Sequence, residues 1–138
     1  MNKQSHISAL SPRERKALTR VIMELLEDWK VKAKDQVSLL ALPEGTKPRA
    51  LKKYHKDEPL PDMEEVNERL SHLLGIADAL HTSYPRNAMM GAYWLSLPND
   101  RFSGRMPITV MLEDGLEGII AVRAHLDCAW DWYRDESS

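Results

Sequence analysis

The residues that most clearly suggest chemistry are cations gathered on one short predicted helix, over 47–55. The segment reads Lys-Pro-Arg-Ala-Leu-Lys-Lys-Tyr-His. Leu51 and Tyr54 can face inward, which leaves the positive side chains to solvent or to a ligand. Lysine and arginine neutralise nucleic-acid phosphates, and arginine can donate two hydrogen bonds to guanine. The segment therefore predicts a DNA-binding surface made of Thr46, Lys47, Arg49, Lys52 and Lys53.

The charge distribution along the chain also favours a polyanionic partner for its first part. Residues 1–57 hold 13 Lys and Arg against 7 Asp and Glu, a net charge of +6. Residues 58–138 hold 6 against 14, a net charge of −8. Opposite charges in the two halves suggest two different partners. The alternative is that the basic stretch is simply the solvated surface of a small helical bundle.

A second group of residues typical of an interaction surface lies in a predicted loop over 97–107. The loop combines the cations Arg101 and Arg105 with the aromatic Phe102 and the flexible Gly104. Arginines and aromatic side chains are enriched at protein interfaces. The alternative is a connection between helices in which Phe102 fills the core, and both interpretations can hold together.

The common motifs of enzymes do not occur. The sequence has no glycine-rich phosphate loop, no His-Glu-x-x-His and no Gly-x-Ser-x-Gly, so we expect neither catalysis nor a cofactor. His125, Cys128 and Asp131 share one face of a predicted helix, but three mixed ligands on one helix are a weak indication of zinc. We expect no metal site.

Helices are predicted to position all of these residues. Ser11-Pro12-Arg13-Glu14 is a capping box that opens the first helix, which ends near Asp28. Its apolar stripe is Leu18, Ile22, Leu25 and Trp29. A short helix over about 33–41 follows and is ended by Pro43-Glu44-Gly45, and Thr46 is expected to cap the basic helix. This order of helix, short helix, turn and basic helix over 11–56 predicts a helix-turn-helix.

The second half is also predicted to be helical. A capping box from Asp62 to Glu65 opens a helix over 62–82, and a helix over 86–96 follows, with bulk from Met89, Met90, Tyr93 and Trp94. A short helix starts at Pro107, and the last covers about 115–133. Nothing alternates with a period of two, so the predicted class is all-α. The stiff connector Glu58-Pro59-Leu60-Pro61 places a domain boundary between a basic region, 1–58, and an acidic region, 59–138.

Length and composition suit a small intracellular protein. The chain has 138 residues, 43% of them hydrophobic, which is enough for a packed core. No apolar run approaches the ~20 residues that span a bilayer, and the N-terminus lacks the apolar core of a signal peptide. Cys128 is the only cysteine, which fits a reducing compartment. We therefore expect a soluble, cytoplasmic protein without a membrane partner.

Several short runs occur in an order and at a spacing typical of one antitoxin family. The runs are Arg69–Ile76, Trp94-Leu95, Pro98–Pro107 and Leu116–Asp127. They match the patterns R-x-x-x-L-L-G-I, W-L-x-x-P-N-x-x-F-x-G-x-x-P and L-E-G-x-x-x-V-R-x-x-L-D. Over about 65–132, roughly half of its length, the chain therefore resembles the MbcA/ParS/Xre antitoxin family. The match is looser near the N-terminus, where Leu39-Leu40 is followed by Ala41 instead of the glycine of the family's Leu-Leu-Gly turn.

The resemblance implies an N-terminal Xre-like helix-turn-helix followed by a helical antitoxin domain. It also implies a partner, a RES-domain toxin that consumes NAD or transfers ADP-ribose from it. On this resemblance we expect the antitoxin to block the toxin's NAD site, and the complex to repress its own operon by binding operator DNA. A homodimer within a larger toxin–antitoxin complex is expected, because operator-binding proteins are commonly two-fold symmetric.

The resemblance also indicates which residues contact the toxin. Asn99, Arg101, Phe102 and Arg105 belong to the family loop and either support the fold or touch the toxin. The C-terminal segment is the expected plug for the toxin's cleft, with aromatic and arginine anchors and with acids that pair with a basic pocket. Its residues are Trp130, Trp132, Tyr133, Arg134, Asp135 and Glu136. Two alternatives stay open: a transcription regulator that acts without a toxin, and an interaction module that no longer binds DNA.

Overall fold

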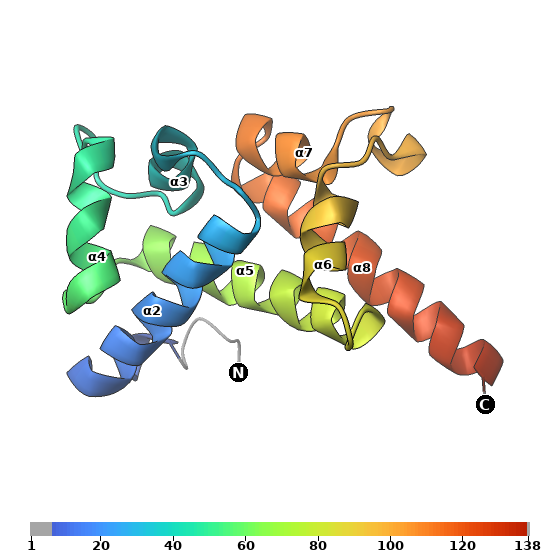
Figure 1. The fold of residues 1–138 in the computed structure, drawn as a ribbon, viewed down its shortest axis with the longest axis horizontal. Coiled ribbons are helices and arrows are strands. Elements are labelled where there is room, and N and C mark those ends of the chain that lie inside the picture. The colour runs from blue at the N-terminus through green and yellow to red at the C-terminus, as the bar shows by residue number, and fades with distance from the viewer. Residues whose placement is uncertain (1–6, 138) are drawn as a thin grey trace. The chain divides into compact units, whose positions relative to one another are not determined.

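The structure is a computed structural model that describes residues 7–137, without the side chains of Ala88 and of residues 129–137. The described residues form the α-helices α2 to α8 and two 3₁₀ helices, with no strand among them. The predicted all-α class is therefore confirmed (Figure 1). None of the helices in this described part is long and apolar enough to cross a membrane.

Contacts between residues divide the chain into two compact units, one up to Ser71 and the other from His72. The first contains α2 (Pro12–Asp28), α3 (Ala33–Leu39), η1 (Pro48–Leu51), α4 (Lys52–Lys56) and the start of α5 (Glu64–Ser83). Within this unit α2 packs against α4, and α3 packs against η1. The proline connector, where the sequence predicted a boundary, belongs to the first unit.

Helix α2 begins as predicted, but the face that it buries is different. The Ser11 hydroxyl accepts a hydrogen bond from the Glu14 amide, and the Glu14 carboxylate accepts one from the Ser11 amide, which completes the capping box. Ile22 and Trp29 are buried as predicted, whereas Leu18 and Leu25 are only half-buried. The rest of the buried face is Arg15, Thr19, Met23 and Leu26. Because Arg15 and Thr19 are polar, the apolar pattern of the sequence did not indicate this face.

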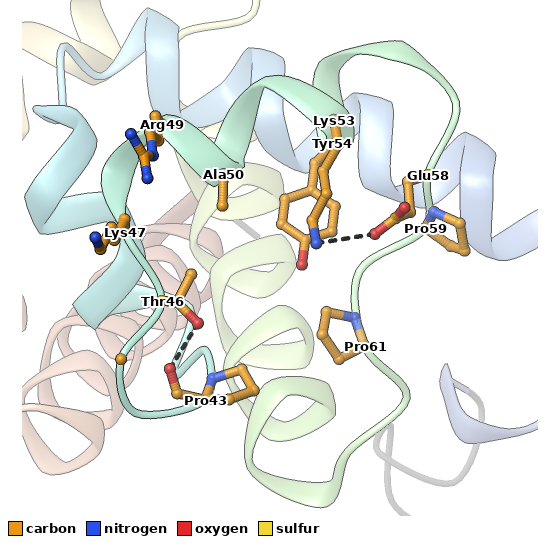
Figure 2. Close-up of a pocket in the computed structure, with 11 residues that line it drawn as sticks. Pro43, Thr46, Lys47, Arg49, Ala50, Lys53, Tyr54, Glu58, Pro59 and Pro61 are labelled. Atoms are coloured by element: carbon orange, nitrogen blue, oxygen red, sulfur yellow. Dashed lines mark hydrogen bonds and ion pairs between the residues drawn. The ribbon is translucent and has the colours of Figure 1, made fainter.

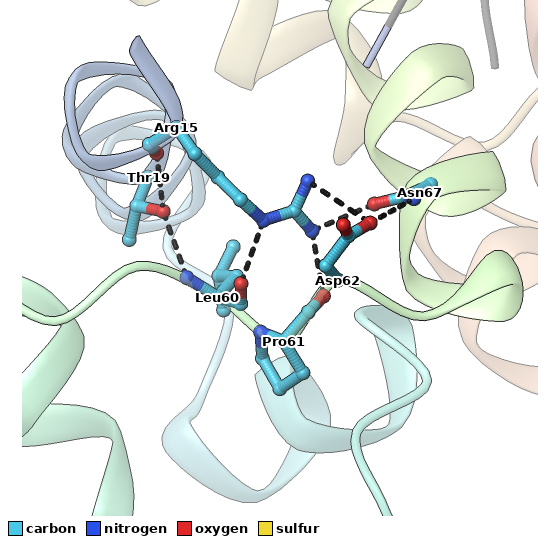
Figure 3. Close-up of polar contacts among 6 residues, drawn as sticks. All are labelled: Arg15, Thr19, Leu60, Pro61, Asp62 and Asn67. Carbon is cyan, nitrogen blue, oxygen red and sulfur yellow. Dashed lines mark hydrogen bonds and ion pairs between the residues drawn. The ribbon is translucent and has the colours of Figure 1, made fainter. Parts of the chain in front are cut away.

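Arg15 and Thr19 are buried because they bind the connector (Figure 3). The Arg15 guanidinium donates to the carbonyls of Leu60 and Pro61 at 2.8 and 2.6 Å, and to Asn67 Oδ1 at 2.6 Å. The Thr19 hydroxyl accepts from the Leu60 amide at 2.9 Å. A connector with prolines at two positions cannot pair its own backbone in a helix. Side chains of α2 supply those partners instead and hold the connector in the first unit.

The sequence predicted α5 over about 62–82, and the observed bounds agree with it within two residues. The helix begins at Glu64, two residues after the predicted start at Asp62. The Asp62 carboxylate accepts from Asn67 Nδ2 at 2.8 Å and lies 3.8 Å from Arg15 Nη1. It thus belongs to the same polar network (Figure 3).

Helices α2 and α3 both end in a left-handed residue that is not glycine. Lys30 follows α2 with φ 61°, and Ala41 follows α3 with φ 55°. After α3, the Leu42 amide donates to the Val37 carbonyl and the Ala41 amide to the Ser38 carbonyl, the two hydrogen bonds of a Schellman motif. Helix α3 therefore ends at Leu39, before the Pro43-Glu44-Gly45 segment that was predicted to break it.

The second unit contains the end of α5, α6 (Ala88–Leu95), η2 (Asp100–Phe102), α7 (Pro107–Glu113) and α8 (Leu116–Ser137). Two glycines permit close approaches in it. A Cβ on Gly75 would collide with the guanidinium of Arg123, and a Cβ on Gly118 would collide with the carbonyl of Val110. Helices α7 and α8 therefore meet at a distance that a larger residue at Gly118 would not allow, whereas the space beside Gly75 is filled by the end of the Arg123 side chain.

Candidate functional site

The basic surface of the first unit is built on η1 and α4. Lys47, Arg49, Lys52 and Lys53 are exposed, as the sequence predicted, while Leu51 and Tyr54 beneath them are each 4% exposed. The element is a 3₁₀ turn that continues into a five-residue α-helix, rather than one helix. Its short form keeps four cations close together on one exposed stretch of chain.

The predicted cap at Thr46 is wrong. The N-cap residue of η1 is Lys47, and no side chain caps it. The Thr46 hydroxyl instead donates to the Pro43 carbonyl at 2.6 Å, which stabilises the preceding turn. Thr46 is half-buried, and its hydroxyl proton is engaged by the Pro43 carbonyl.

One cation of this surface, Lys53, and two basic residues near it lie close to acidic side chains. Lys53 Nζ lies 3.2 Å from Glu58 Oε2, and this hydrogen bond is the main cause of the raised pKa of Lys53. Arg20 pairs with Asp57 at 2.7 Å, and His55 Nε2 lies 3.6 Å from Glu27 Oε1. By contrast, the structure assigns no ion pair within the described part to Lys47, Arg49 or Lys52. These three residues are the strongest candidates for phosphate contacts.

A groove of about 590 Å³ lies beside the basic surface (Figure 2). The Lys53–Glu58 pair lies along one side of it, and the ring of Tyr54 reaches in below Lys53. The remaining walls are mainly proline and backbone: the lining residues are Pro43, Gly45, Thr46, Lys47, Arg49, Ala50, Lys53, Tyr54, Glu58, Pro59 and Pro61. Glu58 offsets the charge of Lys53 on one side of the groove, whereas Lys47 and Arg49, which also line it, keep the groove positive.

The connection between α3 and η1 departs from an ordinary helix-turn-helix. Helix α3 ends at Leu39 and η1 begins at Pro48, so eight residues lie between them. A typical helix-turn-helix joins its helices by three or four residues. The all-helical order is the one predicted for residues 11–56, but the Xre-like arrangement stays a prediction.

The loop of the second unit is held together by Asn99. Its side-chain oxygen accepts from the Arg101 amide at 2.9 Å, and its carbonyl accepts from the amides of Phe102 and Gly104. Its own amide donates to the Arg105 carbonyl at 3.1 Å, which closes the loop. Ser103 and Gly104 both have positive φ, 58° and 82°. Asn99 therefore acts as the internal brace of this turn.

Arg105 has an equally internal role. Its guanidinium donates to Glu113 at 3.2 Å and to both carboxylate oxygens of Asp114, at 3.2 and 3.0 Å. The hydrogen bonds to Asp114 and then Glu113 raise the pKa of Arg105, and the same contact lowers the pKa of Asp114. The residue fastens the loop to the end of α7.

Phe102 belongs to an aromatic cluster that we define as Trp94, Phe102 and His125. Trp94 stacks on the His125 ring with centroids 6.0 Å apart, and Phe102 meets the same ring edge-on at 5.6 Å. All three are half-buried, so Phe102 both fills a gap between helices and remains accessible. Burial and, second, the nearby Arg101 cation lower the pKa of His125.

The residues predicted to form a C-terminal plug lie outside the part whose side chains are described. Helix α8 runs to Ser137, and Trp130, Trp132, Tyr133, Arg134, Asp135 and Glu136 belong to it. The same holds for Asp131 of the weak metal trio. Of the other two, His125 is in the aromatic cluster and Cys128 is exposed.

One exposed surface was not expected from the sequence. Met89 and Tyr93 on α6 are 60% and 57% exposed, whereas the buried residues of this helix are Gly91, Ala92 and Leu95. The i, i+4 spacing of Met89 and Tyr93 could have indicated a common face. Apolarity alone suggested that both contribute to the core.

Comparisons with family profiles, with curated proteins and with solved structures found no match for this chain.

Proposed function

We propose that the chain is the antitoxin of a toxin–antitoxin pair, and that it binds a RES-domain toxin and blocks the toxin's NAD site. In this proposal the antitoxin catalyses nothing. Its second unit neutralises the toxin, and its first unit binds operator DNA so that the complex represses its own operon.

The observation that carries the proposal is that the motif residues engage one another. Gly75 of the first motif lies against Arg123 of the last, and Trp94 and Phe102 of the middle motifs both contact the ring of His125 in the last. Asn99 and Arg105 of the middle motif hold one loop together. If the motifs had matched the family pattern by chance, contacts between them in the fold would not be expected. Their convergence supports the interpretation of the runs as one domain signature.

The DNA-binding part of the proposal is supported by electrostatics. Lys47, Arg49 and Lys52 are exposed cations with no ion pair in the described structure, within a region of net charge +6. Each phosphate neutralised by such a side chain releases counterions, which gives affinity that falls with salt. The same observation also fits a second candidate, a transcription regulator that acts without a toxin. An adjacent gene for a RES-domain protein favours the antitoxin.

An electrophoretic mobility shift on the upstream operator tests the DNA-binding part. We expect a salt-sensitive shift that weakens when Arg49, Lys52 and Lys53 are all changed to alanine. If all three contact phosphates, the slope of log K against log salt falls by about 2–3. Arg86→Ala, in the second unit, is the control and should leave the slope unchanged. A wild-type chain that never shifts the operator, alone or with toxin, contradicts DNA binding.

Deletion of residues 130–138 tests the C-terminal plug. We expect the truncated chain to lose toxin neutralisation in co-expressing cells, because aromatic and arginine anchors commonly dominate interface energy. Complete neutralisation by the truncated chain would refute the plug and leave the rest of the second unit as the toxin-binding element.

A further inference from the structure

Helix α6 turns an apolar face outward. Met89 and Tyr93 lie one turn apart and are 60% and 57% exposed, and Leu97, just beyond the helix, is 39% exposed. The opposite side of the helix is fixed by packing, since Gly91 lies against Leu80 of α5. The outward direction of Met89 and Tyr93 therefore follows from how α6 is anchored. We call Met89, Tyr93 and Leu97 the α6 face.

The aromatic cluster extends this face toward a cation. Trp94, next to Tyr93, stacks on His125, and Phe102 packs edge-on against the same ring. Arg101, the residue before Phe102, acts electrostatically on His125. The aromatic cluster and Arg101 thus interact with one another, and the α6 face belongs to the same helix as Trp94. Methionine, aromatic residues and arginine are the types enriched at protein interfaces.

The positive charge of Arg101 is not compensated within the described structure. Arg105 is neutralised by Glu113 and Asp114, whereas exposed Arg101 has no hydrogen bond or ion pair from its guanidinium within the described structure. A partner that covers Arg101 must therefore bring hydrogen-bond acceptors, and a carboxylate would also compensate the charge, because an unpaired cation is costly to desolvate. A partner that covers the α6 face must bring apolar side chains.

We propose that the toxin docks on the α6 face and the aromatic cluster, with an acidic side chain of the toxin opposite Arg101. This inference rests on the proposed function and adds a surface to it. Among the loop residues, Arg101 and the exposed part of Phe102 contact the toxin. Asn99 and Arg105 hold the loop in shape and do not contact it.

Affinity of the full chain for the RES-domain protein that the proposed function expects as product of an adjacent gene, measured by calorimetry, tests the proposal. We expect the double variant Met89→Ser/Tyr93→Ser and the single variant Arg101→Glu each to bind at least 30-fold more weakly, as interface anchors do. Arg101→Lys keeps the charge and should lose much less. The matched controls Val21→Ser, at an exposed apolar position of α2, and Lys34→Glu should bind within twofold of wild type.

Thermal unfolding and light scattering separate the outcomes. All variants should unfold at the wild-type temperature, since the changed side chains are exposed. Wild-type affinity in the α6 and Arg101 variants overturns this inference while the antitoxin function stands. Altered self-association with unchanged toxin affinity also overturns it, and assigns the face to a second copy of the chain. A wild-type chain that does not bind the RES-domain protein overturns both the inference and the proposed function.

Discussion

Arg15 is the residue whose replacement tests the account of the first unit most severely. It is 6% exposed and donates three hydrogen bonds, two to connector carbonyls and one to Asn67. Burial lowers the pKa of its guanidinium, an effect that the nearby Asp62 partly opposes. The free-energy cost of desolvating this cation is therefore offset only by its hydrogen bonds and by the nearby Asp62 charge.

The change Arg15→Met keeps most of the volume and removes all three hydrogen bonds. Each hydrogen bond from a charged donor contributes about 1.5–3 kcal/mol, and the released desolvation cost of the cation offsets part of the loss. We expect a net loss of about 3 kcal/mol in the free energy of unfolding. Thr19→Val, which leaves the Leu60 amide without its partner, should cost about 1–2 kcal/mol.

Urea unfolding followed by circular dichroism measures both losses, and hydrogen exchange over 12–28 assigns them to the first unit. Arg13→Met is the matched control, because Arg13 is exposed on the same helix, and it should change stability by less than about 0.5 kcal/mol. If Arg15→Met proves too unstable to purify, Thr19→Val carries the test. A loss below about 1 kcal/mol for Arg15→Met, or no loss for Thr19→Val, would refute the reasoning.

Three further predictions concern turns, charge and pH. Ala41→Gly should stabilise the protein by about 0.5–1 kcal/mol in the same urea assay, because glycine adopts a φ of 55° without strain; a destabilised variant would contradict the left-handed turn. Glu58→Gln should free Lys53 and tighten operator binding about threefold at low salt, with the gain fading as salt rises; a weaker complex in mobility shifts would count against the basic surface. Because the pKa of His125 is lowered, the folded state resists a proton that the unfolded chain accepts below about pH 6.5, so stability should fall between pH 7 and 5. His125→Gln should make that fall shallower in thermal melts, and an unchanged pH profile would exclude this role.

The sequence was sufficient for features that depend on local chemistry. The capping box at Ser11 and the inward Leu51 and Tyr54 follow from short spacings, and the structure has all of them. Periodicity also identified the core residues of α8 up to Leu126, because Ile119 and Val122 lie at helical spacing from it.

Features that depend on distant partners could not be predicted in the same way. Arg15 is polar, and only the carbonyls of a connector 45 residues away explain its burial. Thr46 has the right type for a cap, but its hydroxyl binds Pro43. Tyr93 looks like a core residue until the packing of Gly91 against Leu80 fixes which side of α6 faces outward. In each case the deciding contact lies outside the local pattern.

The central claim is that this chain neutralises a RES-domain toxin, and one measurement tests it directly. The chain is co-expressed and purified with the RES-domain protein that the proposal expects as product of an adjacent gene, and NAD consumption by the complex is compared with that of the toxin alone. The account predicts a stable complex in which NAD consumption is suppressed. A toxin that consumes NAD at the same rate with and without a stoichiometric amount of this chain would contradict it.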